Sequence, residues 1–161
     1  MRRFTLAVDV CLLFITLAAL TYPAHSIENC AKDAGENMGG EFPKDTPARR
    51  SVGKGFFMMG IVLDAADCEA VSGAKVIYWL ARPDGKYDPE HEGYVTTNKH
   101  GVFWLESNFP GTYEIAPPHI HFAVTADKYK SVVTVYAPEP GNDSGWLDVT
   151  MVRQDPATAA P

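Results

Sequence analysis

Short apolar runs alternate with turn-forming residues along most of the chain after residue 54. Six of these runs are rich in β-branched and aromatic residues, and they span 56–63, 74–81, 101–105, 119–124, 131–136 and 146–152. Each run is bounded by turns that contain Gly, Pro, Asn or Asp, which is typical of short strands. After the N-terminal leader, no stretch of about twelve residues has the 3.6-residue period of an amphipathic helix. The pattern predicts an all-β fold, a β-sandwich of about seven to eight strands over residues 55–153.

The two ends of the chain differ from this region. Residues 1–26 combine a basic start, an apolar run and a closing small-residue site, which predicts a signal peptide that is removed on export. The alternative is an anchoring helix, because the apolar run is nearly long enough to span a bilayer. Residues 27–54 have no helical or strand period, and we expect an irregular N-terminal arm there and a flexible tail at 154–161. The protein is therefore predicted to be exported, to the periplasm or the medium.

Composition and charge narrow the possible partners. The chain has 161 residues and a formal net charge of −6, which fits one acidic domain of ordinary globular composition. No basic patch is visible, so we expect no nucleic-acid partner. We also expect no membrane association once the signal peptide is removed.

Cysteine usage agrees with export. Cys11 lies in the predicted signal peptide, which leaves Cys30 and Cys68 in the mature chain. An even number of cysteines in an oxidising compartment predicts a Cys30–Cys68 disulfide with a structural purpose. Two unpaired thiols are the alternative.

Candidate metal-binding chemistry lies in two histidines and two tyrosines. His119 and His121 are two positions apart in a predicted strand, so their imidazoles face the same side and form half of a metal site. A His-x-His pair alone is also explained by two surface histidines. Tyr87 and Tyr113 each follow a turn, and each taken alone is explained as a half-buried packing residue. The three tryptophans, Trp79, Trp104 and Trp146, are expected to pack the sandwich.

A series of motifs gives these residues a common context. In chain order they are Gly60-Ile61-Val62-Leu63-Asp64 leading to Cys68, Ser72-Gly73-Ala74-Lys75-Val76 with Trp79, Gly85-Lys86-Tyr87, Thr97-Asn98-Lys99-His100-Gly101-Val102-Phe103, Pro110-Gly111-Thr112-Tyr113 and His119-Ile120-His121-Phe122. In type and order they resemble the catalytic domain of the intradiol ring-cleavage dioxygenases, the catechol and protocatechuate dioxygenases. The resemblance covers roughly residues 55–152.

The resemblance implies a mononuclear Fe(III) held by Tyr87, Tyr113, His119 and His121, with Tyr87 and His119 equatorial and the other two axial. Two hard tyrosinate oxygens favour ferric iron, and the iron in turn lowers the phenol pKa from about 10. Tyr113 is the implied catalytic residue, because its phenolate can accept a catechol proton. The implied reaction opens a catechol with O2 between its two hydroxylated carbons and gives a muconate-type dicarboxylate.

The chain also departs from the family pattern around these ligands. Ala116 stands where the family has an Arg before the His-x-His strand, Tyr94 replaces another Arg, and the next strand lacks the usual Gln. These changes predict either a compact variant with a more open substrate pocket or weakened catalysis. Arg82, Lys86 and His91 are candidates for a replacement charge, although solvated loop residues are the better explanation for all three.

Two other functions stay open on the sequence. One is a transthyretin-like or carboxypeptidase-regulatory-like β-sandwich binding module without metal or catalysis, which shares the Gly-Ala-x-Val strand pattern. The other is an exported protein that binds copper or zinc at His119 and His121. The set of two tyrosines and two histidines favours the dioxygenase. The acidic run Asp88, Glu90 and Glu92 is expected to be a solvated loop. If it lines the substrate entrance instead, it favours neutral over anionic catechols.

Overall fold

Two β-sheets packed face to face make up the protein. The computed structural model describes Cys30 and residues 37–154. The strands are β1 (Phe56–Asp64), β2 (Lys75–Leu80), β3 (Glu92–Thr96), β4 (Val102–Ser107), β5 (Ile120–Thr125), β6 (Val132–Tyr136) and β7 (Ser144–Met151), with a short 3₁₀ turn, η2 (Pro89–His91), before β3. Among the described residues, no helix has the length and apolar character that a membrane span needs.

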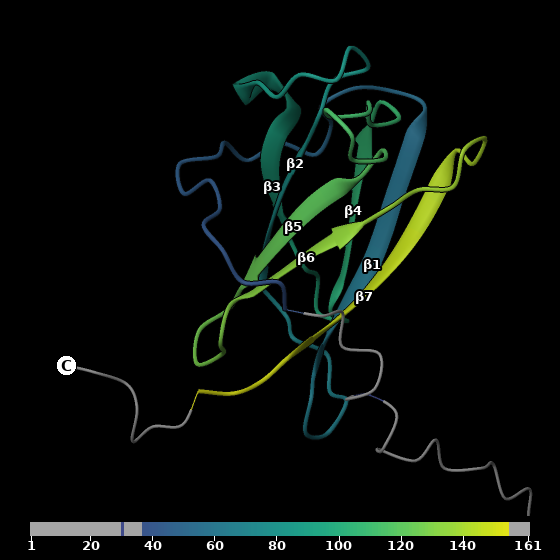
Figure 1. The fold of residues 1–161 in the computed structure, drawn as a ribbon. Coiled ribbons are helices and arrows are strands. Elements are labelled where there is room, and N and C mark those ends of the chain that lie inside the picture. Colours follow the sequence, from purple (N-terminus) through teal and green to yellow (C-terminus); the bar gives the residue numbers. More distant parts are fainter. Residues whose placement is uncertain (1–29, 31–36, 155–161) are drawn as a thin grey trace, which may run out of the picture.

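The sheets differ in size and in strand direction. The smaller sheet has the order β4-β1-β7, in which β1 is antiparallel to β4 and parallel to β7. The larger sheet has the order β3-β2-β5-β6 and is antiparallel throughout. In Figure 1 the loop after β2, the turn η2 and the loop before β5 lie together at the top of the molecule.

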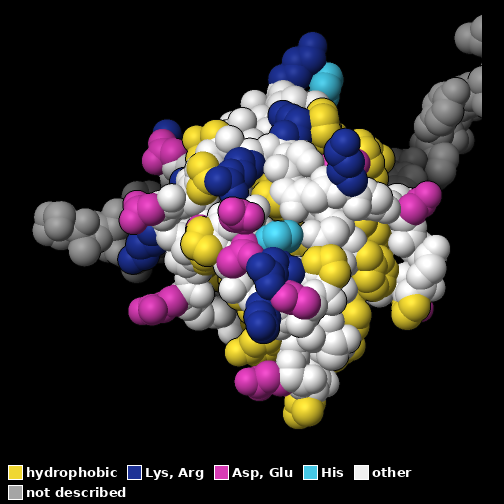
Figure 2. All heavy atoms as spheres, turned by 90° about the horizontal axis from the view of Figure 1, so that it is seen from above, with side chains coloured by type: hydrophobic (Ala, Val, Ile, Leu, Met, Phe, Trp, Pro, Cys, Tyr) yellow, Lys and Arg dark blue, Asp and Glu magenta, His cyan; other side chains and the backbone are white. Residues whose placement is uncertain are grey.

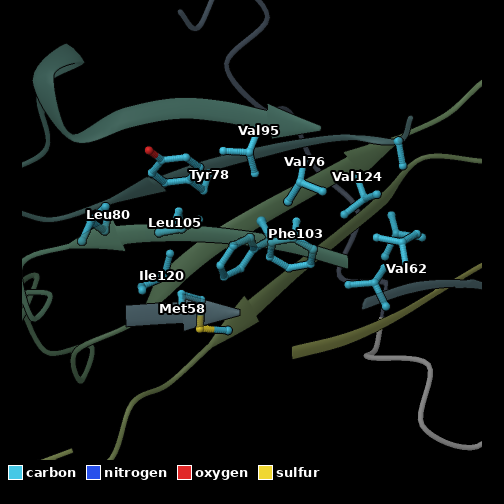
Figure 3. Packing of buried hydrophobic residues seen from close by; sticks show 14 of the residues in the cluster. Met58, Val62, Val76, Tyr78, Leu80, Val95, Phe103, Leu105, Ile120 and Val124 are labelled. Carbon is cyan, nitrogen blue, oxygen red and sulfur yellow. The ribbon is translucent and has the colours of Figure 1, made fainter. Parts of the chain in front are cut away.

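The core fills the space between the sheets. Its largest fully buried side chains are Tyr78, Phe56, Phe103, Phe122, Met58, Leu80, Leu105 and Ile120. Figure 3 shows labelled members of this cluster pointing between the strands of the two sheets. Gly60 of β1 leaves room for the Phe103 ring, because a Cβ there would lie 2.5 Å from it. Burial of these side chains is the main contribution to the stability of the fold.

The structure confirms the all-β sandwich, with seven strands among the residues that it describes. All six apolar runs form strands, but β3 was not among the predicted runs. Only Gly93 and Val95 of its five residues are buried, so it has no apolar run to reveal it. As an edge strand it depends on pairing with β2 rather than on its own hydrophobic pattern.

The described part of the N-terminal arm, 37–54, runs along both sheets. It makes isolated bridges between Ala48 and Tyr94 of β3 and between Ser51 and Glu106 of β4. The predicted Cys30–Cys68 disulfide is present, with the two Cα atoms 5.8 Å apart. The predicted signal peptide, and the predicted tail beyond Gln154, lie outside the described residues.

Candidate metal centre

Loops at one end of the larger sheet bring the four candidate ligands together. Tyr87 lies in the loop after β2, and Tyr113 lies between β4 and β5. His119 directly precedes β5, and His121 is the second residue of that strand. All four line one pocket of about 640 Å³. This volume is in the range of small-molecule sites, about 300–1,000 Å³. The structure therefore places at one point four residues that are separated by up to 34 positions in sequence.

His119 is oriented by its own loop. Its Nδ1 lies 2.7 Å from the carbonyl oxygen of Pro117. A carbonyl oxygen only accepts hydrogen bonds, so we assign the proton to Nδ1 and a lone pair to Nε2. That Nε2 lies 2.9 Å from Nε2 of His121 and 3.2 Å from the Tyr87 hydroxyl oxygen. Three possible ligand atoms thus converge, with one of them already in the tautomer that binds a metal.

The spacing of these atoms fits a single metal ion. Two ligands that are each about 2.1 Å from one ion and at right angles to each other are about 3 Å apart. The observed separations, 2.9 Å and 3.2 Å, agree with that value. Within the described part of the chain, no group of three or more His, Cys, Asp and Glu side chains could hold a metal ion. A metal bound at this point therefore depends on the tyrosine oxygens.

The two tyrosines lie edge to face. The ring centroids of Tyr87 and Tyr113 are 5.0 Å apart with an interplanar angle of 71°. Burial raises the pKa of Tyr87, and the neighbouring Tyr113 raises it further. Without a cation, Tyr87 therefore stays a neutral phenol at neutral pH. A bound metal ion reverses this preference, because its charge stabilises the phenolate.

His121 is held in its neutral form by its surroundings. Burial, and then the neighbouring His119, lower the pKa of His121 to about 4. The ring stacks on the indole of Trp79, with centroids 4.8 Å apart and an interplanar angle of 3°. Trp79 also lines the pocket, a role that we did not predict from the sequence. The stack fixes the plane of an imidazole that is unprotonated and available as a ligand.

Close backbone packing brings the two tyrosine loops together. The amide of Gly111 donates to the carbonyl oxygen of Ala81, over 3.2 Å. A Cβ at Gly111 would lie 2.1 Å from the carbonyl oxygen of Arg82, so a larger residue there would push the loops apart. This contact is one reason why Tyr87 and Tyr113 can meet.

Asp88 and the N-terminal arm support the segment that follows Tyr87. Asp88 caps η2, accepting hydrogen bonds from the amides of Glu90 and His91 and from Nδ1 of His91, the last at 2.8 Å. Arg49 of the arm donates to the carbonyl oxygens of Pro89 and Glu90, at 3.1 and 3.2 Å. No local sequence pattern indicates this brace, because Arg49 and η2 are 40 residues apart.

The three candidates for a replacement charge do not line the pocket. Arg82 pairs with Asp84 and lies 3.3 Å from Asp88, and His91 is bonded to Asp88. Lys86 is exposed and is not among the described lining residues. Figure 2 shows this end of the molecule, where acidic and basic side chains intermingle around a histidine. Ala116, at the position of the family Arg, does line the pocket.

The sequence was compared with known proteins. No family model matches it. Among curated proteins, chlorocatechol 1,2-dioxygenase of Pseudomonas sp. (strain P51) is 26% identical over 108 residues, which cover 51% of this chain and 42% of that protein. The chain thus spans less than half the length of the curated relative that it matches.

Three solved structures illustrate the structural similarity. Chlorocatechol 1,2-dioxygenase from Pseudomonas putida has a TM-score of 0.61 at 19% identity, covering 71% of this chain and 70% of that one. Hydroxyquinol 1,2-dioxygenase from Pseudomonas putida DLL-E4 has a TM-score of 0.61 at 18% identity, covering 72% and 65%. An intradiol ring-cleavage dioxygenase from Tetranychus urticae has a TM-score of 0.62 at 18% identity, covering 74% and 93%.

Proposed function

We propose that this chain, which has the fold of the intradiol ring-cleavage dioxygenases, cleaves the ring of a catechol with O2 at an Fe(III) centre. Tyr87, Tyr113, His119 and His121 would hold the iron. The observation that carries the proposal is the meeting of the Tyr87 oxygen and the two histidine Nε2 atoms, with neighbouring atoms 2.9 and 3.2 Å apart. This convergence argues against the two alternative functions. A binding module without metal does not require these atoms to meet, and a copper or zinc site made only of the His-x-His pair does not require the two tyrosines.

Bound ferric iron would supply a Lewis acid that holds a deprotonated catechol and makes its ring reactive toward O2. The protein would supply the rest of the chemistry. His119 offers its Nε2 lone pair because Nδ1 donates to Pro117. Tyr113, which is 41% exposed, would take up a catechol proton at its phenolate oxygen and release it to solvent. Trp79 and the ring of Tyr87 would form apolar walls for the substrate ring.

The proposed product is a muconate-type dicarboxylate, formed by opening the bond between the two hydroxylated carbons. Export to an oxidising compartment is also part of the proposal. The Cys30–Cys68 disulfide supports it, because such bridges persist mainly outside the cytosol. The protein would then act on catechols that it meets in the periplasm or the medium.

Oxygen consumption by the iron-loaded protein tests the proposal. The purified protein is loaded with ferric iron, catechol is added, and both oxygen uptake and the product are followed. We expect one O2 consumed per catechol and a muconate-type product. Tyr87→Phe should abolish the reaction. Tyr94→Phe is the matched control, because Tyr94 lies in β3 and does not line the pocket. Iron-loaded protein that consumes no oxygen with any simple catechol would refute the proposed activity.

A further inference from the structure

A row of three side chains crosses the outer face of the larger sheet beside the metal centre. Trp79 of β2 pairs in register with Glu92 of β3 on one side and with His121 of β5 on the other. All three side chains line the same pocket. Neighbouring strands are about 4.8 Å apart, so the Glu92 backbone lies about 10 Å from that of His121, with the indole between them. A catechol whose hydroxyls lie at the His121 end and whose ring lies along Trp79 would point its ring substituent toward Glu92.

The charged side chains that line the pocket are all acidic. Of the described lining residues, Asp88 and Glu92 carry carboxylates, and none is Lys or Arg. Asp88 accepts a hydrogen bond from His91 and lies 3.3 Å from the Arg82 guanidinium. The Glu92 side chain has no hydrogen-bond or ion-pair partner among the residues that the structure describes. Glu92 is therefore the free negative charge at the far end of the row.

Two nearby arginines have other partners. Arg82 pairs with Asp84 and Asp88, and Arg49 donates to the backbone carbonyls of Pro89 and Glu90. Ala116 lines the wall near His119 and adds no positive charge there. The electrostatic potential inside the pocket is consequently negative, because the charged groups that an incoming substituent would meet are carboxylates.

We propose that Glu92 makes this pocket select catechols with a cationic substituent, such as an alkylammonium group, over catechols with a carboxylate. This inference rests on the proposed function, because it assumes that the catechol hydroxyls bind at the tyrosine and histidine end. An ammonium group near Glu92 forms an ion pair on the rim of an open pocket, whereas a carboxylate there is repelled. A catechol with an uncharged substituent is the reference against which both effects are measured.

Three catechols with side chains of similar length test the charge preference. Dopamine carries an ammonium, ethylcatechol is neutral, and dihydrocaffeate carries a carboxylate. Dissociation constants for the iron-loaded protein are measured without oxygen, by calorimetry, so that binding is read apart from turnover. We expect dopamine to bind about fivefold more tightly than ethylcatechol, and dihydrocaffeate about fivefold more weakly. Both differences should shrink at about 0.5 M salt, because the pocket is open to solvent.

Two substitutions assign the effect to one side chain. Glu92→Gln keeps the size of the side chain and removes its charge, so it should remove most of both differences, each taken relative to ethylcatechol binding by the same variant. Glu90→Gln is the matched control, because it removes a carboxylate two positions away that does not line the pocket. It should leave all three dissociation constants as they are.

The outcomes separate this inference from the proposed function. Equal binding of the three catechols, or a preference that persists in Glu92→Gln, would overturn the inference and leave the dioxygenase proposal standing. Binding of none of the three would refute the proposed function and the charge preference together.

Discussion

The two outer faces of the sandwich carry exposed aromatic rings to a similar extent but differ in what those rings can do. On the larger sheet, Tyr87 is 36% exposed and lies beside the Trp79–His121 stack; we call this the site face. On the smaller sheet, Trp104 is 41% and Trp146 49% exposed, and both pair in register with Met59 of β1; we call this the Trp104 face. We predicted that these two tryptophans pack the sandwich, and the structure shows instead that they lie outside it.

The difference lies in the loops rather than in the aromatic content. On the Trp104 face, Trp104 stacks on Phe57 with centroids 5.9 Å apart, and the Arg50 guanidinium lies 4.1 Å above its ring. On the site face, the loops after β2 and before β5 bring the Tyr87 hydroxyl within 3.2 Å of His119 Nε2, which lies 2.9 Å from Nε2 of His121. Exposed aromatics are thus a poor marker of a site unless ligand atoms converge next to them.

The largest change should come from the core that both faces share. Phe103 is 1% exposed and touches the ring of Phe122 between the sheets. Phe103→Ala should lower the free energy of unfolding by about 3–5 kcal/mol, because it leaves a cavity under both faces. Urea unfolding followed by tryptophan fluorescence measures this. Trp104→Ala next to it serves as the control and should cost much less, and equal costs would contradict the assignment of Phe103 to the core.

The disulfide should stabilise the fold without affecting the site face. It joins the N-terminal arm to the loop after β1, and neither cysteine lines the pocket of the four candidate ligands. The double variant Cys30→Ser, Cys68→Ser should lose about 2–4 kcal/mol of unfolding free energy, because a cross-link restricts the unfolded chain. Thermal unfolding and iron affinity are measured on the same sample. A large loss of iron affinity in the folded variant would show that the bridge also shapes the site.

Substitution of one candidate ligand should show the clearest difference between the two faces in their effect on iron affinity. His121→Ala should weaken ferric iron binding by at least about 100-fold, because altering even an indirect support of a metal commonly costs 10–100-fold. Trp146→Ala on the opposite face should leave iron affinity unchanged. Equilibrium dialysis with metal analysis gives both values. Equal iron affinity in the two variants would place the metal away from the site face.

Acid should weaken the fold through Asp64, at the end of β1. Burial alone would raise the pKa of this carboxyl, but hydrogen bonds from the Ala66 amide, the Tyr129 hydroxyl and Arg153 outweigh it and hold the pKa below its ordinary value. Because the folded-state pKa is the lower one, the stabilisation is complete above about pH 5 and is lost as the pH falls through the folded-state pKa.

Asp64→Asn tests this linkage. The substitution should cost about 1–3 kcal/mol at neutral pH, because it removes the charged acceptor of these hydrogen bonds. The difference from the parent protein should narrow as the pH falls toward 3, in urea unfolding at matched pH values. A difference that stays constant down to that pH would exclude the ionised Asp64 as its source.

The smallest effect is expected on the Trp104 face. Arg50→Ala should cost about 0.5–1 kcal/mol, since an exposed cation–π contact with Trp104 contributes about that much. Neither iron binding nor oxygen uptake should change. Reduced activity in the folded variant would mean that the two faces are coupled through the arm.

The strands with a strong hydrophobic pattern were predictable from the sequence. Strand β3 lacks such a pattern and was not predicted. The six runs found in the sequence carry their own buried side chains, whereas β3 is an edge strand that pairs with β2 and, through Tyr94, with the arm. The four candidate ligands were also reached from the sequence, because their motifs resemble a known family. Their close approach depends on tertiary contacts, such as Gly111 against Arg82, that no local pattern shows.

The supporting residues of the site were not predictable for the same reason. Trp79 was expected to be a packing residue, yet its indole stacks on His121 at the edge of the pocket. Arg49 reaches Pro89 across 40 residues of sequence, and its role follows only from the path of the arm. Glu92 belonged to an acidic run that we predicted to be a solvated loop. Its register opposite Trp79 separates it from Glu90, which does not line the pocket.

The central claim is that two tyrosines and two histidines on the site face hold ferric iron that a catechol can reach. The most direct test is the visible spectrum of the iron-loaded protein before and after catechol is added without oxygen. The account predicts a red-brown tyrosinate-to-iron absorption band that shifts with catechol and is lost in Tyr87→Phe but kept in Tyr94→Phe. A colourless protein, or a band that Tyr87→Phe leaves intact, would contradict it.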